Sequence, residues 1–258
     1  MPVSSPPPRK LALIAGVFWI ITFAASIPAL ILYAPVLNHA HYVLTAGADT
    51  RIEVGAFLEV ILAIAGIGTA VTMFPILKRQ NESIALGFVA SRVLESTVII
   101  VGIISVLSVV TLRKEFAGVA GADTSSLLVT GKSLVAVHKW TFLLGPGFCA
   151  GFGNGLLLGY LMYRSRLVGR RMALLGLIGG PLLIVSCIAV LFGAYTQTST
   201  TAGILTIPEF AWELFLGIYL IAKGFKTSSP VFYTHPAAAS GAEANGAART
   251  TTPAVATP

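Results

Sequence analysis

Charged residues are scarce in this 258-residue chain, and their scarcity excludes most soluble architectures. Only 10% of the residues are Asp, Glu, Lys or Arg, whereas 55% are hydrophobic and the mean hydropathy is +0.86. Soluble globular proteins carry about 25% charged residues. A chain with so few charges is expected to place its apolar side chains against lipid, so we expect an integral membrane protein.

Cysteine and histidine are also rare, with two and four residues. Cys149 and Cys187 both lie inside apolar runs, which excludes a disulfide framework and a zinc knuckle. His39 and His41 flank a single residue, but no further ligands adjoin them, so no metal site is predicted. No motif identifies a cofactor, and its identity stays unknown.

Acidic residues are fewer than basic ones, and the net charge is +7. This excess would indicate nucleic-acid binding if the basic residues shared one soluble face with interleaved aromatic residues. They stand instead in short clusters between apolar runs, where they contact lipid headgroups and set orientation. Nucleic acid is therefore excluded as a partner, and the expected partner is the lipid bilayer.

The apolar residues are gathered in runs long enough to cross a bilayer, which takes about 20 residues. The runs predict transmembrane helices at about 11–33, 54–77, 84–112, 134–163, 172–194 and 207–224. The predicted fold class is all-α, a six-helix bundle within residues 9–225. A disordered lead is expected at 1–8, and a disordered tail rich in Ala, Gly, Thr and Pro at 226–258. The polar segments at 113–133 and 195–206 are expected to be loops.

The basic residues predict the orientation, because Lys and Arg concentrate in cytoplasmic loops. One side of the alternating loops holds Arg9, Lys10, Lys78, Arg79, Arg164, Arg166, Arg170, Arg171, Lys223 and Lys226. The other side holds Arg51, Arg113, Lys114 and Lys132. Both termini are therefore expected in the cytoplasm.

Ionisable residues inside the apolar runs are the candidates for function, because a charge at bilayer depth costs several kcal/mol unless it is paired or hydrated. Arg92 and Glu95 share a helix face at spacing i, i+3, which favours an ion pair. We expect one polar cavity, open to the outer side, lined by Glu59, Arg92, Glu95, His138, Lys139 and Glu213. Glu209 is expected near the surface, where it can reach water.

Such a cluster allows three roles, and the spacing does not choose among them. Carboxylates and a histidine can relay protons, bind a divalent metal or hold a cationic ligand. The first functional hypothesis is binding or translocation of a small polar ligand, ion or proton. An intramembrane enzyme acting on a lipid-like substrate, with Glu59, His138 and Glu213 as acid–base groups, is the second. The third is a structural or regulatory partner subunit whose polar pairs specify helix packing.

Glycines in the fourth run predict close helix packing. Gly147, Gly151 and Gly155 recur every four residues, which lets a neighbouring helix approach. A serine protease site would need a Gly-x-Ser-x-Gly-like setting, and none is present.

Several segments resemble a known family of bacterial membrane proteins. They are Arg9–Gly16, the Arg-x-x-Glu pair within Ser91–Glu95, Leu157–Ser165, and Pro208–Glu213 continuing to Phe225. The chain resembles the domain of unknown function 4386 (DUF4386) family over about residues 9–225. The resemblance implies a bacterial inner-membrane location. It also implies that family members tend to carry Arg and Glu at the positions of Arg92, Glu95 and Glu213, but it indicates no reaction. Lys139 and the Gly-Pro-Gly segment at 145–147 depart from the family pattern.

Overall fold

The described residues contain six helices that are long and apolar enough to cross a membrane and contain no strand, which confirms the predicted all-α fold class. The computed structural model describes residues 7–39, 41–45, 47–116, 118–119 and 121–233. The spanning segments are α1 Pro8–Leu32, α3 Asp49–Leu77, α4 Glu82–Phe116, the segment Thr124–Ser165, α7 Arg170–Leu191 and α8 Thr200–Ala222. Most of the predicted lead and the tail from residue 234 lie outside the described residues.

The fourth spanning segment is helical throughout but changes its winding. It consists of α5 Thr124–Phe142, the π-helical segments η2 Leu143–Cys149 and η3 Gly151–Leu158, and α6 Gly159–Ser165. Three short elements lie outside the spanning helices: α2 Ala34–Asn38, η1 Tyr42–Leu44 and η4 Pro230–Phe232. A π-helix is wider than an α-helix and often marks a functional region.

Two helices begin well before the predicted residues, so the loops expected at 113–133 and 195–206 are wrong over much of their length. The reason is capping. The Asp123 carboxylate accepts from the Ser125 backbone N–H at 3.0 Å and starts α5 at Thr124. The hydrogen bonds from Ser125 and Ser126 lower the pKa of Asp123 to about 2. Ser199 caps α8 in the same way, so polar sequence forms helix outside the apolar runs.

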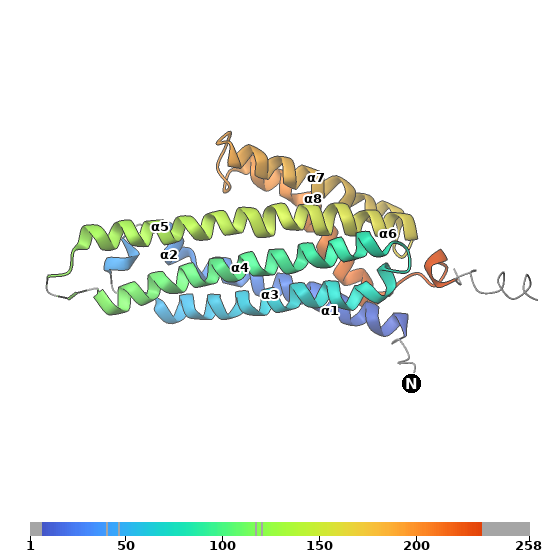
Figure 1. Ribbon diagram of the computed structural model, residues 1–258, viewed down its shortest axis with the longest axis horizontal. Helices are drawn as coiled ribbons and strands as arrows, with labels where there is room; N and C mark the ends of the chain where they lie inside the picture. Colours follow the sequence, from blue (N-terminus) through green and yellow to red (C-terminus); the bar gives the residue numbers. More distant parts are fainter. Residues whose placement is uncertain (1–6, 40, 46, 117, 120, 234–258) are drawn as a thin grey trace, which may run out of the picture.

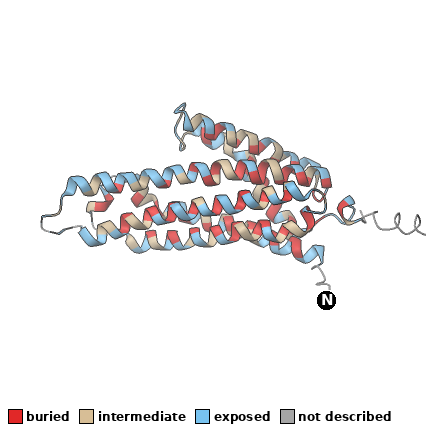
Figure 2. Cartoon of the chain, in the orientation of Figure 1, coloured by how far each residue is buried: buried red, intermediate tan, exposed pale blue. Residues whose placement is uncertain are grey.

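The spanning helices form a closed series of contacts. α1 packs against α3 and α8, α3 packs against α4, α4 packs against α5, η2 and η3, and α7 packs against η3 and α8. α4 and α5 run well beyond the α7–α8 hairpin, and that hairpin diverges from α5 toward its connecting loop (Figure 1). Figure 2 shows the buried residues on the faces that the helices turn toward one another.

Two larger apolar clusters and a smaller one form the core of the described residues, and the buried pair Arg92–Glu95 lies between the two larger clusters. The first, near the termini, contains Trp19, Phe88 and Trp212, and the second, toward the opposite end, contains Tyr33 and Ile99. On α4, Phe88 belongs to one cluster and Ile99 to the other, so residues 89–98 cross a polar layer. The candidate site lies at this layer.

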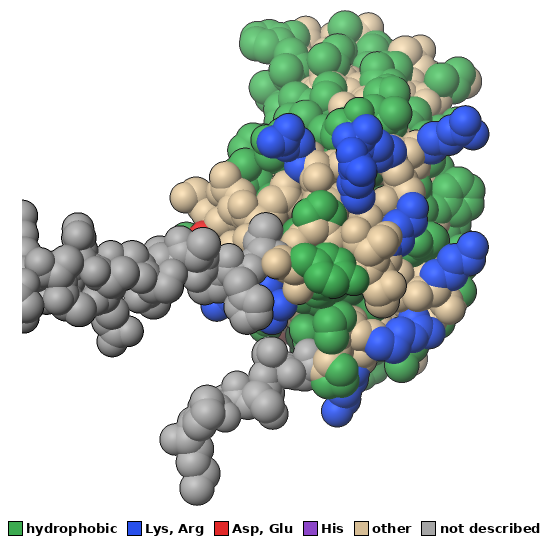
Figure 3. All heavy atoms as spheres, turned by 90° about the vertical axis from the view of Figure 1, so that its right-hand side faces the viewer, with side chains coloured by type: hydrophobic (Ala, Val, Ile, Leu, Met, Phe, Trp, Pro, Cys, Tyr) green, Lys and Arg blue, Asp and Glu red, His purple; other side chains and the backbone are tan. Residues whose placement is uncertain are grey.

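The end of the bundle near both termini is basic (Figure 3). All ten Lys and Arg residues assigned to the cytoplasmic side from the sequence are exposed. Residues 226–233 also differ from the predicted disordered tail, because the structure places them against this end. The Ser229 hydroxyl donates to the Ser165 carbonyl at 2.6 Å, and Val231 is buried in the first cluster.

Candidate acidic cavity in the membrane-spanning region

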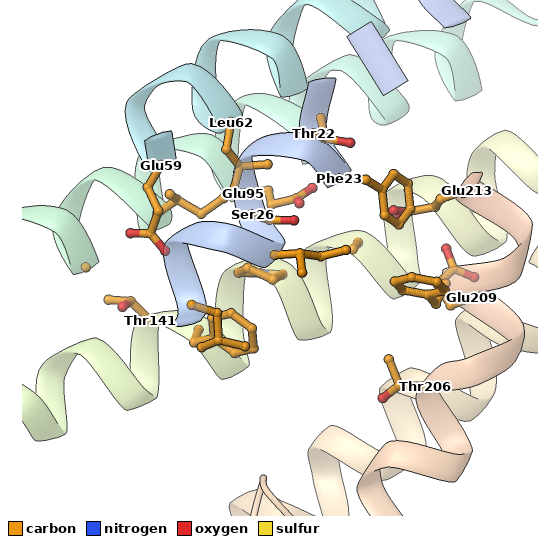
Figure 4. Close-up of a pocket in the computed structure, with 18 of the residues that line it drawn as sticks. Thr22, Phe23, Ser26, Glu59, Leu62, Glu95, Thr141, Thr206, Glu209 and Glu213 are labelled. Atoms are coloured by element: carbon orange, nitrogen blue, oxygen red, sulfur yellow. The ribbon is translucent and has the colours of Figure 1, made fainter. Parts of the chain in front are cut away.

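A cavity of about 300 Å³ lies between the helices at the polar layer. Its charged and polar lining residues are Thr22, Ser26, Glu59, Arg92, Glu95, His138, Thr141, Thr206, Glu209 and Glu213. Its apolar lining includes Phe23, Ile27, Leu30, Phe142, Pro146 and Phe210. Figure 4 shows the glutamates approaching the space from α3, α4 and α8.

Of the six predicted site residues, five line this cavity and Lys139 does not. Lys139 follows His138 directly on α5, and a helix turns by about 100° per residue, so the two side chains point in different directions. His138 is buried, whereas Lys139 is exposed and borders a second cavity of about 320 Å³ together with Lys132. The depth of Lys139 in its apolar run predicted a place in the cavity, but depth does not determine which face of the helix a side chain occupies.

Arg92 contacts three neighbouring residues, Glu95, Gly66 and Trp19. Its Nη1 donates to Glu95 Oε2 at 2.7 Å, as the i, i+3 spacing predicted, and its Nε donates to the Gly66 carbonyl at 3.2 Å. The guanidinium also lies 5.2 Å from the centroid of the Trp19 ring. Glu95 therefore has a permanent counter-ion, and Arg92 holds α3 and α4 together.

Glu213 is held by a residue that the sequence reasoning did not select as a site residue. The Asn154 Nδ2 donates to Glu213 Oε1 at 2.6 Å, and the Trp212 indole donates to the Asn154 carbonyl at 2.9 Å. Asn154 is fully buried on η3. Asn154 stands in a run of glycine and leucine, and a buried polar side chain needs a hydrogen-bond partner. That position in the sequence could have identified Asn154 as a partner of a buried charged residue.

Glu209 lies in the cavity wall, contrary to its expected place near the surface. Because α8 begins at Thr200, Glu209 lies about 14 Å along the helix from its first residue. The side chain is 2% exposed, and among the described residues neither carboxylate oxygen has a hydrogen-bond partner. It packs against a glycine, since a Cβ added at Gly155 would lie 2.7 Å from Glu209 Oε2.

His138 and Glu59 form the opposite wall. The His138 ring meets the Tyr33 ring edge-on, with the centroids 5.5 Å apart, and Tyr33 also neighbours Glu59. Gly102 leaves room for this wall, because a Cβ there would approach Thr141 Oγ1 to 2.7 Å and His138 Cδ2 to 3.5 Å. His138 and Glu59 are 4% and 8% exposed, so both depend on the cavity for access.

The charges in the cavity do not balance. Four glutamates face one arginine, which gives a net charge of −3 when all are ionised. Within the described residues, no three His, Cys, Asp or Glu side chains come close enough to hold one metal ion. The cavity lining therefore carries an excess of acidic groups over basic ones.

The fold and cavity define a polytopic α-helical membrane protein with an acidic chamber between its helices. The model of the family described as domain of unknown function (DUF4386) matches residues 14–224, so the chain belongs to this family, and the resemblance stated above is confirmed. No curated protein and no solved structure matches the chain.

Proposed function

We propose that the protein binds a small cation, protons included, in the acidic cavity and moves it across the bilayer. The observation that carries this proposal is Glu209, a buried carboxylate that lines the cavity and has no hydrogen-bond partner among the described residues. A lone carboxylate at bilayer depth is strongly destabilising as an anion. It requires a proton or a cation, and the cavity gives either one room to bind.

The neighbouring groups do not supply that cation. Arg92 is the cation that lines the cavity, and it already bonds to Glu95 and to the Gly66 carbonyl. Glu213 adds a second carboxylate on the same helix face, one turn further along α8. A mobile cation bound near these two glutamates offsets both charges, whereas a packing role alone leaves Glu209 unsatisfied.

The position of the cavity supports access from the outer side. Ile27 and Leu30 lie near the end of α1 that leads to residues 33–48, and Thr206 lies near the start of α8. These elements belong to the end of the bundle with few basic residues, which the positive-inside rule assigns to the outside. We therefore place both termini in the cytoplasm and the cavity in the outer half of the membrane.

Electrical recording from proteoliposomes on a solid support tests the proposal. Rapid jumps in proton and in tetramethylammonium concentration are applied to the wild type, to Glu209→Gln and to Glu82→Gln. Glu82 is an exposed carboxylate in the first turn of α4 and is the matched control. We expect a current in the wild type and in Glu82→Gln, and a loss of about tenfold or more in Glu209→Gln, because the amide removes the negative charge. Wild-type protein that passes neither cation contradicts the proposal.

A further inference from the structure

The rim of the cavity is apolar, in contrast to its floor. Ile27 and Leu30 on α1 are 47% and 51% exposed, and Phe142 on α5 and Phe210 on α8 are 38% and 43% exposed. All four also line the cavity. The space therefore opens between side chains of the kind that face lipid, and the charged residues lie deeper.

The rim lies within the membrane-spanning helices rather than at a loop. Phe210 is near the middle of α8, about 15 Å along the axis from Thr200, in a helix about as long as the bilayer is thick. The hairpin of α7 and α8 diverges from α5 on this side of the bundle (Figure 1). The opening between α1, α5 and α8 therefore points sideways, toward lipid.

Polarity increases in steps from the rim to the floor. Phe23 and Phe210 meet edge-on with their centroids 5.0 Å apart and join α1 to α8 beside the opening. The hydroxyl-bearing residues Ser26 and Thr206 also line the cavity and are half-buried, whereas Glu209 is buried, so exposure falls from the apolar rim through the hydroxyl groups to this carboxylate. Figure 4 shows Ser26, Thr206 and the glutamates around the space. A molecule with one apolar end and one cationic end matches this gradient.

We propose that the ligand is an amphipathic organic cation, an amine or quaternary ammonium with a single hydrocarbon tail, which enters sideways from the outer leaflet. This inference rests on the proposed cation-binding function. The charged nitrogen binds at Glu209 and Glu213, and the tail leaves the cavity between Phe142 and Phe210. Aromatic faces on the path favour a cation over an anion.

The dimensions and the charge exclude ordinary phospholipids. A volume of about 300 Å³ is at the lower limit of small-molecule sites and holds a headgroup with a few carbons, while the rest of one tail remains in lipid. A phospholipid brings a phosphate, which four glutamates repel, and a second tail. An amine or quaternary ammonium with a single hydrocarbon tail has neither a phosphate nor a second tail.

Binding measurements in nanodiscs test the inference, with empty nanodiscs subtracted to remove partition into lipid. The probes are tetramethylammonium, hexyltrimethylammonium and dodecyltrimethylammonium, and the proteins are the wild type, Glu209→Gln, Leu30→Ser and Leu13→Ser. Leu13 is an exposed α1 leucine that does not line the cavity, so it controls for polarity on the same helix. Ile27→Ser is a second rim variant that guards against a folding defect in the first.

We expect wild-type affinity to rise at least about tenfold from the tetramethyl to the dodecyl probe, because the apolar rim contacts the longer chain. Leu30→Ser and Ile27→Ser should reduce that gain, measured in each variant as the ratio of dodecyl to tetramethyl affinity, by about threefold or more. Leu13→Ser should match the wild type, and Glu209→Gln should lose all three probes.

The other outcomes separate this inference from the proposed function. One outcome is that tetramethylammonium binds and needs Glu209, but longer chains bind no more tightly and the rim variants have no effect. This result overturns the sideways entry and leaves cation binding intact. Proton currents without Glu209-dependent binding of any probe overturn the amphipathic ligand alone. Wild-type protein that shows neither a current nor binding of any probe overturns both proposals.

Discussion

At the scale of single residues, the polar layer combines one satisfied pair with one unsatisfied carboxylate. Arg92 and Glu95 are buried and bonded to each other at 2.7 Å, whereas Glu209 has no hydrogen-bond partner in the part of the chain that the structure describes. The pair stabilises the packing of α3 on α4, because Arg92 also donates to the Gly66 carbonyl. A buried ion pair and a buried carboxylate without a hydrogen-bond partner among the described residues thus line the same cavity.

A double-mutant cycle separates these roles. Arg92→Gln leaves Glu95 as a buried, unpaired charge, and we expect it to lower the free energy of unfolding by about 3–5 kcal/mol. The double variant Arg92→Gln/Glu95→Gln should recover part of this loss, because both charges are gone. Thermal unfolding in detergent measures the stability of Arg92→Gln, Glu95→Gln and the double variant beside that of the wild type. Losses that simply add in the double variant would show that the pair is not coupled.

At the scale of elements, glycines on η2 and η3 bring the fourth spanning segment against α7 and α4. A Cβ at Gly151 would lie 2.9 Å from the Gly180 carbonyl oxygen of α7, and one at Gly153 would lie 2.6 Å from the Ser91 hydroxyl of α4. This confirms the close packing that the four-residue glycine spacing predicted. The approach also sets the position of Glu209 in the cavity wall, through Gly155.

Alanine at Gly155 tests this packing. The added methyl group collides with Gly180 and with the Glu209 carboxylate, so we expect the free energy of unfolding to fall by about 1–3 kcal/mol. Gly203→Ala is the control, because nothing lies within 4 Å of its added Cβ, and alanine favours helix there. Both are measured by thermal unfolding. Equal stability of the two variants would contradict the role of Gly155.

At the scale of the whole molecule, the charge distribution is one-sided. The basic residues cover the end near both termini (Figure 3). The opposite end holds fewer basic residues, and two of them are paired, Arg113 with Asp49 and Lys114 with Glu53. Unpaired basic residues interact with anionic headgroups, so the basic end is expected on the cytoplasmic side.

Single cysteines report the orientation directly. In a background with Cys149→Ala and Cys187→Ala, a membrane-impermeant maleimide added to intact cells should label Ser125→Cys and leave Glu82→Cys unlabelled. The two positions are exposed, at opposite ends of the bundle. Glu82→Cys should react once the cells are permeabilised. Labelling of Glu82→Cys alone in intact cells would reverse the assigned topology.

The sequence was sufficient for the six spans because apolar runs depend only on composition, and the structure confirms them. It was insufficient for Lys139 and Glu209 because membership of a cavity depends on helix face and on where a helix begins. Thr200 rather than Ile207 begins α8, and the earlier start places Glu209 deep in the membrane. Asn154 was missed because its partner, Glu213, is distant in sequence and adjacent only in the folded bundle.

The contact between the first and last spanning helices has a consequence for biosynthesis. Arg9 on α1 donates to the Leu220 and Ile221 carbonyls at the end of α8, at 3.1 Å and 2.7 Å. Since α8 is synthesised after the other five spanning helices of the described residues, its contact with α1 forms only once all five have been made. A nascent chain that has inserted five helices still lacks Glu209 and Glu213, so it has no complete acidic chamber. The acidic chamber and the contact between α1 and α8 are therefore completed in the same insertion step, that of α8.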